Sequence, residues 1–237
     1  PDVHFSGSFF APPEGGRYEL PNTSGFESRC DEAMYLCGVL AGLITKVNKV
    51  GYVMAWEIPS LIIALNNFIM AAKKVNPKVK VYYVIPSEWS DPTKGAASVD
   101  ALVPKGIDFV TTFGDTMSQG VVTRAEKLGM YSVGYMTDAK YHSRFGPTTC
   151  LGTIWFKAKN VMEHMYEQAV EIKKTGKQYS VWHSYNIAQE GQDLDLNKDL
   201  IHLIPANVLS AIDKERADLI SGATKLPMNT KLPEQPT

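Results

Sequence analysis

The feature that most constrains the fold is a series of short apolar runs that alternate with helical patterns through the middle of the chain. Such runs begin at residues 50, 79, 107 and 131, and the run at 79–85 is apolar on both faces. Between them apolar residues recur with helical spacing, and the segment 59–75 has a proline in its first turn. Strands that are apolar on both faces, each followed by a helix, predict βαβ units and a parallel sheet that is covered on both sides.

The same reading extends over the whole chain and predicts an α/β fold. We expect strands at 3–6, 50–54, 79–85, 107–112, 131–134, 151–155 and 178–183. We expect helices at 27–45, 59–75, 92–103, 116–128, 157–174 and 203–220. The last helix should start after Pro205, and Gly176 and Gly222 should end the last two. Proline and glycine at 11–25 predict an exposed loop, and 226–237 predicts an extended or disordered tail.

Composition excludes several classes of protein. Hydrophobic residues make up 44% of the 237 residues, enough to bury a core. Lys and Arg number 24 against 25 Asp and Glu, so no basic surplus indicates a nucleic-acid partner. The longest apolar run, 34–44, is too short to span a bilayer. No signal-peptide pattern opens the chain at Pro1, so we expect any such segment to have been removed.

The cysteines and histidines indicate neither a disulfide framework nor a metal site. Cys30 and Cys37 lie seven residues apart on one predicted helix, about 10 Å along its axis. A disulfide needs less than about 7 Å, so they cannot pair while the helix stands, and Cys150 is remote in sequence. The five histidines, at 4, 142, 164, 183 and 202, have no ligand spacing, so we expect no metal.

Aromatic and acidic residues follow the predicted strands, at the edge where ligands of parallel sheets bind. These residues are Trp56, Trp89, Asp115, Asp138 and Trp155. A flat ring can stack on the tryptophans, and a carboxylate can accept hydrogen bonds from neighbouring hydroxyls. The pattern therefore favours binding of a ring that carries a polyol.

Each of these positions also has a structural interpretation. Asp91, before Pro92, is expected to cap a helix, and Asp115 fits a cap and a ligand contact equally well. No clear helix follows Asp138, which favours a ligand contact there. Trp56 and Trp89 fit half-buried rim residues as well as stacking residues.

No catalytic signature accompanies the pattern. The chain has no Gly-x-Ser-x-Gly elbow, no phosphate-binding glycine loop and no spaced Cys/His pair. Asp115 and Asp138 could in principle hydrolyse a glycosidic bond, but nothing in the sequence keeps one of them protonated. We therefore expect no catalytic residues and no cofactor.

Several landmarks follow one another as in a known family. They are Gly51-Tyr52-Val53, Ile58-Pro59, Val75-Asn76-Pro77, the turn Trp89-Ser90-Asp91-Pro92-Thr93-Lys94, and Gly134-Tyr135-Met136-Thr137-Asp138. In their order and spacing the chain resembles the basic membrane protein family of solute-binding proteins, which includes purine nucleoside receptor lipoproteins of ABC transporters. It departs from the family pattern at Met136 and Ser90, and Gln189-Glu190-Gly191 stands where Lys-Asp-Gly is typical.

The resemblance implies a type I periplasmic-binding-protein-like fold, with two doubly wound parallel-sheet lobes, three crossings and a ligand cleft between the lobes. Residues 1–46 would form part of lobe 1, 47–155 the complete lobe 2, and 156–225 the return to lobe 1. The family's opening strands would precede Pro1, which leaves lobe 1 incomplete.

The resemblance also implies roles for individual residues. Asp138 would hold ribose hydroxyls, and Asp115 would contact the sugar or the base edge. Trp89 would stack on the purine from one lobe, and Phe9 or Phe10 from the other.

The function implied is a monomeric extracytoplasmic receptor that passes a purine nucleoside or nucleobase to the permease of an ABC transporter. A lipid anchor on a segment outside this sequence would be compatible with this role. A ligand-sensing ectodomain of a signalling receptor and a nucleoside or glycoside hydrolase are the alternatives.

Overall fold

The computed structural model describes residues 3–8, 22–177 and 182–236, which form two β-sheets with their helices. The larger sheet has six strands in the order β4-β3-β5-β6-β7-β9. The first five are parallel, and β9 pairs antiparallel with β7 so that Trp155 lies opposite Asp193. The strands are β3 (Lys49–Met54), β4 (Lys80–Val84), β5 (Phe109–Phe113), β6 (Tyr131–Met136), β7 (Cys150–Phe156) and β9 (Gln192–Leu196).

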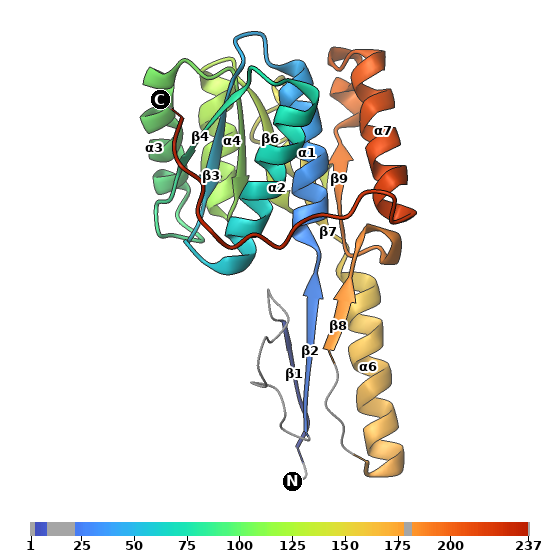
Figure 1. The fold of residues 1–237 in the computed structure, drawn as a ribbon. Coiled ribbons are helices and arrows are strands. Elements are labelled where there is room, and N and C mark those ends of the chain that lie inside the picture. Colours follow the sequence, from blue (N-terminus) through green and yellow to red (C-terminus); the bar gives the residue numbers. More distant parts are fainter. Residues whose placement is uncertain (1–2, 9–21, 178–181, 237) are drawn as a thin grey trace.

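Helices cover both faces of the larger sheet (Figure 1). On one face lie α1 (Cys30–Ile44), α2 (Pro59–Val75) and α7 (Ala206–Ile220), and on the other α3 (Pro92–Leu102), α4 (Met117–Lys127) and α5 (Ala139–His142). Neighbouring residues of β3 show the alternation, because Tyr52 contacts Phe68 of α2 at 5.2 Å between ring centroids while Gly51 faces Leu102 of α3. The predicted parallel sheet, covered on both sides, is confirmed.

α1 and α2 pack closely against each other in this core. A Cβ atom on Gly38 would lie 2.3 Å from the carbonyl oxygen of Phe68, so only glycine permits this approach. Met34, Leu36 and Leu40 of α1 are completely buried beside it. α1 is therefore a central core helix of the larger sheet.

The smaller sheet is parallel and has the order β1-β2-β8. Its strands are β1 (Phe5–Ser8), β2 (Thr23–Ser28) and β8 (Trp182–Tyr185), and α6 (Ala158–Thr175) runs beside it (Figure 1). Gly176, with φ of 68°, ends α6 as predicted.

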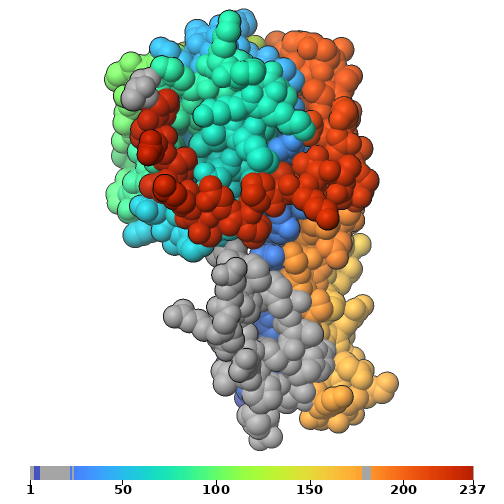
Figure 2. Space-filling view, viewed as in Figure 1, coloured from blue at the N-terminus to red at the C-terminus, as the bar shows by residue number. Residues whose placement is uncertain are grey.

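After α7 and its turn, residues 223–236 form no helix or strand and cross the outside of α2 to reach β4 (red in Figure 2). We call this segment the strap. The Asn66 side chain donates to the carbonyls of Asn229 (2.8 Å) and Lys231 (3.0 Å). The Gln235 amide donates to the backbone oxygen of Tyr83 at 2.8 Å and accepts from its nitrogen at 3.4 Å. These bonds attach the strap to the edge of the sheet.

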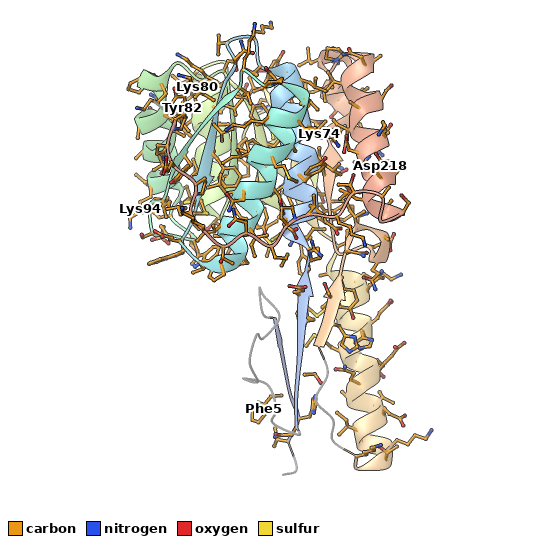
Figure 3. All side chains as sticks on the ribbon, in the orientation of Figure 1. Phe5, Lys74, Lys80, Tyr82, Lys94 and Asp218 are labelled. Carbon is orange, nitrogen blue, oxygen red and sulfur yellow. The ribbon has the colours of Figure 1, made fainter. Side chains whose placement is uncertain are left out.

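A buried polar cluster connects α7 to α1 and α2. The Tyr35 hydroxyl donates to Glu215 Oε2 at 2.7 Å, and Lys74 Nζ lies 2.7 Å from Glu215 Oε1. Glu215 is buried, whereas Lys74 projects from α2 between that helix and α7 (Figure 3). α7 is therefore fixed to the helical layer of the larger sheet.

Three features differ from the sequence prediction. β2 begins at Thr23, inside the segment 11–25 that was expected to be a loop. β9 was not predicted, because its alternating sequence Gln192-Asp193-Leu194-Asp195-Leu196 lacks the continuous apolar run of the other strands. A short helix, α5, follows Asp138, where none was expected.

These placements bear on the predicted division into lobes. α1, β9 and α7 belong to segments that were assigned to lobe 1, yet they pack with the larger sheet. We therefore propose that the larger unit takes in α1, β9 and α7 as well as 47–155. Separately, no helix in the described part of the chain combines the length and the apolar character needed to cross a membrane.

Candidate functional site

The carboxyl ends of both sheets point toward the junction between them (Figure 1). The chain passes this junction three times: from β2 into α1, from β7 into α6, and from β8 through η2 (Ile187–Gln189) into β9. Backbone hydrogen bonds join these crossings, from Arg29 N to Tyr185 O (2.9 Å) and from Lys157 N to Gly191 O (3.0 Å). A ligand at the carboxyl edge of the larger sheet would therefore lie beside the three crossings.

The predicted residues lie at or just after the ends of the strands in the order β4-β3-β5-β6-β7 along this edge, namely Trp89, Trp56, Asp115, Asp138 and Trp155. Trp155 is the last but one residue of β7. Trp56 and Trp155 are 40% and 38% exposed, so each presents a ring surface to solvent. Trp89 is half-buried and packs against the core. Phe9 and Phe10 lie outside the described residues.

Hydrogen bonds between loops hold the edge together around Trp89 and Asp115. Glu88 N donates to Ala55 O at 3.1 Å, and Met117 N donates to Trp89 O at 3.2 Å. Glu88 Oε1 accepts the backbone N–H groups of Trp89 and Ser90, each at 2.9 Å, and these bonds lower the pKa of Glu88. The Trp89 loop is thus fixed against the start of α4, next to Asp115.

The Asp115 side chain does not cap α4, so the first of its two predicted roles, that of a helix cap, is excluded. Thr116 occupies the N-cap position, and no side chain caps the helix. Among the described residues, no hydrogen bond to the Asp115 carboxylate is present. The residue is exposed at the edge, yet the surrounding protein still raises its pKa by desolvation. The carboxylate is therefore available to a hydrogen-bond donor from outside the chain.

Two more acidic residues at this edge, Asp91 and Asp138, are helix caps. Asp91 accepts from Thr93 N at 2.7 Å at the start of α3, as predicted. Asp138 accepts from Tyr141 N at 2.7 Å through Oδ1 at the start of α5, contrary to the expectation that no helix follows it. The cap uses one carboxylate oxygen of Asp138, so a ligand contact through Oδ2 is compatible with it.

Asp138 and Trp155 share a hollow of about 530 Å³ beside α5 and β9. Its floor is fixed where Asp195 Oδ2 accepts from Ala139 N at 3.0 Å. The remaining lining residues are Lys140, Leu196, Asn197, Lys198 and Asp199. The structure thus brings two of the predicted residues together in one hollow, while Trp56, Trp89 and Asp115 lie outside its lining.

Sequence reasoning missed three polar residues at the junction. Gln192 Oε1, Thr137 Oγ1 and Ser28 Oγ are buried without a hydrogen-bond partner among the described residues. Ser28 ends β2, Gln192 begins β9 and Thr137 follows β6. These oxygens are three of ten such atoms among the described residues, so they are compatible with a ligand or ordered water at the junction but do not by themselves mark a site. Thr137 could have been found from its place beside Asp138, whereas Gln192 required knowledge of β9.

Backbone strain occurs at the same edge. Met136, the last residue of β6, has φ of 81° although it is not glycine. This is one of the positions where the chain departs from the family pattern. Strained residues cluster at ligand sites, which supports a functional interpretation of this edge.

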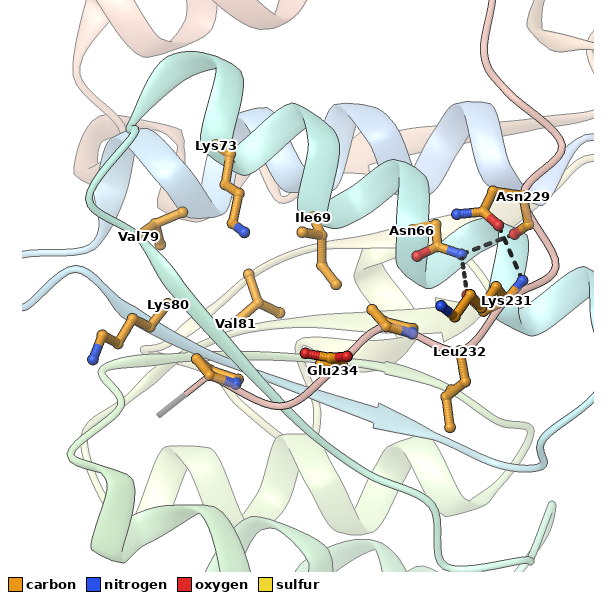
Figure 4. A pocket seen from close by; sticks show the side chains of 12 residues that line it. Asn66, Ile69, Lys73, Val79, Lys80, Val81, Asn229, Lys231, Leu232 and Glu234 are labelled. Atoms are coloured by element: carbon orange, nitrogen blue, oxygen red, sulfur yellow. Dashed lines mark hydrogen bonds between the residues drawn. The ribbon is translucent and has the colours of Figure 1, made fainter.

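A second hollow, of about 460 Å³, lies between α2, β4 and the strap (Figure 4). Ile69, Val79, Val81 and Leu232 line it together with Lys73, Lys231 and Glu234. None of the predicted site residues contributes to it, and it is lined by the amino-terminal part of β4. We therefore place the candidate site at the carboxyl edge.

The family described as "ABC transporter substrate-binding protein PnrA-like" matches residues 14–222. The chain belongs to this family. The family is the substrate-binding component of ABC transporters, and the resemblance inferred from the sequence is confirmed.

Individual relatives of the PnrA-like family give more detail. A purine-binding protein of Brucella abortus is 29% identical over 154 residues, covering 65% of this chain and 41% of that protein. A putative ABC transporter glucose-binding protein of Haloferax volcanii is 32% identical over 116 residues, covering 48% of this chain and 29% of that protein. This chain thus spans less than half the length of these relatives.

The fold agrees with this membership. The crystal structure of an ABC transporter solute-binding protein from Aeropyrum pernix superposes with a TM-score of 0.77 at 14% identity, covering 95% of this chain and 71% of that chain. The predicted type I periplasmic-binding architecture is therefore confirmed.

Proposed function

We propose that this chain belongs to an extracytoplasmic solute-binding protein that captures a purine nucleoside or nucleobase for the permease of an ABC transporter, without catalysis. Family membership supports the transport role, and the purine-binding relative supports the ligand class. The glucose-binding relative makes a sugar the principal rival ligand.

One observation carries the proposal: the carboxylate of Asp115 has no hydrogen bond among the described residues and lies beside the fixed Trp89 loop. An exocyclic amine or a ribose hydroxyl can donate to such a carboxylate while a flat base contacts a tryptophan ring. Asp138 and Trp155 repeat the combination of carboxylate and ring at the next two strands. An uncharged ligand would also suit a chain whose formal net charge is -1.

Isothermal titration calorimetry with inosine, guanosine, adenosine, their bases and glucose tests the ligand class. We expect a purine compound to bind most tightly. Binding of glucose, with no heat from any purine compound, would refute the purine assignment. Release of free base and sugar from an incubated nucleoside would establish the hydrolase alternative instead.

Two matched variants test the site. Asp115→Asn removes the charge but keeps the size, and we expect ligand affinity to fall about 10-fold or more, because a hydrogen bond to a charged group contributes about 1.5–3 kcal/mol. Asp138→Asn retains an acceptor for the cap, and we expect a similar loss for a ribose-containing ligand. Asp91→Asn, a cap at the same edge, is the control and should bind normally. Unchanged affinity in both site variants would contradict the assignment.

A further inference from the structure

Two histidines that are 19 residues apart in sequence meet between α6 and β8. His164 Nε2 lies 2.7 Å from His183 Nε2, and the ring centroids are 3.9 Å apart. Gln168, one helical turn after His164, places its side-chain Nε2 3.1 Å from His164 Nε2 and 3.0 Å from His183 Nε2. Three polar atoms from two elements thus form a triangle whose edges are all close to 3 Å.

Protons cannot satisfy all three contacts of this triangle. If the Gln168 amide nitrogen donates to both rings, both Nε2 atoms must be unprotonated, and neither can donate to the other. If the amide is turned so that its oxygen accepts from both rings, both Nε2 atoms must be protonated, and neither can accept. In either orientation one short contact is left without a hydrogen bond.

The three side chains of the triangle are buried or half-buried. Along the 18 residues of α6, Val161 and Gln168 are the residues that are buried, so the amide occupies a position where an apolar side chain would be expected. His164 and His183 are half-buried, which leaves a route for water and ions.

We propose that His164, His183 and Gln168 form a binding site for a divalent transition-metal ion of the zinc class. A metal accepts the two imidazole lone pairs and one amide oxygen lone pair at once, and so satisfies all three groups without protons. Neighbouring ligand atoms about 2.1 Å from a tetrahedral zinc ion are about 3.4 Å apart. The three atoms, which are 2.7–3.1 Å apart, would therefore separate by a few tenths of an ångström when the ion binds. Neutral imidazole suits Zn²⁺, Cu²⁺ and Ni²⁺.

The amide is essential to this set of ligands. No three His, Cys, Asp or Glu side chains gather as a possible metal site in the portion of the chain that is described. Gln168 therefore supplies the third ligand, and water completes the coordination on the exposed side. The five histidines gave no ligand spacing in the sequence because α6 and β8 contribute one each.

A bound ion would join α6 to the edge strand of the smaller sheet. Among the strands that the structure describes, β8 pairs with β2 alone, and α6 has Val161 as its other buried residue. Metal binding should therefore raise the thermal stability of this part of the protein.

Calorimetry with Zn²⁺ on the 237-residue chain, freed of metal by chelation, tests the proposal. We expect one ion per chain with a micromolar dissociation constant. His164→Gln and His183→Gln should each weaken binding at least about 10-fold. His202→Gln, which changes an exposed histidine on η3 (Lys198–Leu203), is the control and should leave it unchanged. Equal Zn²⁺ affinity in the wild type and the double variant His164→Gln/His183→Gln would overturn the proposal.

A spectroscopic measurement on the unaltered chain does not depend on the folding of variants. With one equivalent of Cu²⁺, electron paramagnetic resonance should show coupling to two imidazole nitrogens. A spectrum without imidazole coupling would equally overturn the proposal.

Discussion

Glu215 connects α7 to α1 and α2, and replacing it shows which of its two interactions holds α7 in place. Tyr35 donates to it from a side chain that is 1% exposed, and Glu215 itself is 6% exposed. Lys74 approaches from the surface, with its side chain 48% exposed. The hydrogen bond is therefore buried, whereas the ion pair is largely solvated.

The magnitudes follow from this difference. A buried hydrogen bond to a charged group contributes about 1.5–3 kcal/mol, and an exposed ion pair about 0–1 kcal/mol. Tyr35→Phe keeps the ring and should lower the free energy of unfolding by about 2 kcal/mol, and Lys74→Met by less than about 1 kcal/mol. Glu215→Ala leaves the Tyr35 hydroxyl hydrogen without its acceptor and should cost about 3 kcal/mol.

Urea unfolding followed by far-ultraviolet circular dichroism measures these differences. The double variant Tyr35→Phe/Glu215→Ala closes a thermodynamic cycle, and we expect a coupling energy of about 1–2 kcal/mol. The reasoning is refuted if Lys74→Met destabilises the protein as much as Glu215→Ala. A coupling energy near zero would refute it as well.

Three further predictions concern packing, pH and thiol chemistry. Gly120→Ala would place a Cβ atom 1.7 Å from the carbonyl oxygen of Pro92 and should lower the free energy of unfolding by about 3 kcal/mol or more. Gly129→Ala, at φ of 67° in open space, should lower it by about 1 kcal/mol. Equal losses of unfolding free energy in urea would contradict this. Burial lowers the pKa of His142 below its unfolded value near 6.5, so its contribution to stability is complete above about pH 6.5 and is lost as the pH falls through the folded pKa. The unfolding free energy should therefore fall less between pH 7.5 and 5 in His142→Gln than in the wild type, and an unchanged slope would exclude the effect. Burial raises the pKa of the Cys37 thiol to about 12. Ellman's reagent should therefore leave this thiol unreacted at pH 8 until urea unfolds the chain. Rapid labelling of Cys37 in the native protein would contradict the structure.

The larger sheet could be predicted because its strands are apolar on both faces and its helices begin and end with clear signals. The helix 59–75 was predicted with the bounds that the structure gives, since Pro59 begins it and Asn76-Pro77 follows it. β9 could not be predicted in this way. As an antiparallel edge strand it carries alternating polar residues, and its assignment to the larger sheet depends on pairing with β7 across the third crossing.

The candidate site shows the same contrast. Residues at or just after the ends of strands, such as Trp155 and Asp115, could be placed at the carboxyl edge because parallel strands share that edge. Gln192 and the pair His164 and His183 could not, because their proximity depends on how α6, β8 and β9 pack. Sequence spacing carries no information about such contacts between elements.

The strap has a consequence for how the molecule behaves among copies of itself. β4 is the outermost strand of the larger sheet, and such a strand can add a strand from another chain. The Gln235 amide imitates a backbone peptide at Tyr83, and the Tyr83 hydroxyl donates to Pro233 O at 2.7 Å. Residues 223–236 thus close the open edge with a side-chain amide and prolines, which cannot continue a ladder, and so protect the sheet from intermolecular strand addition.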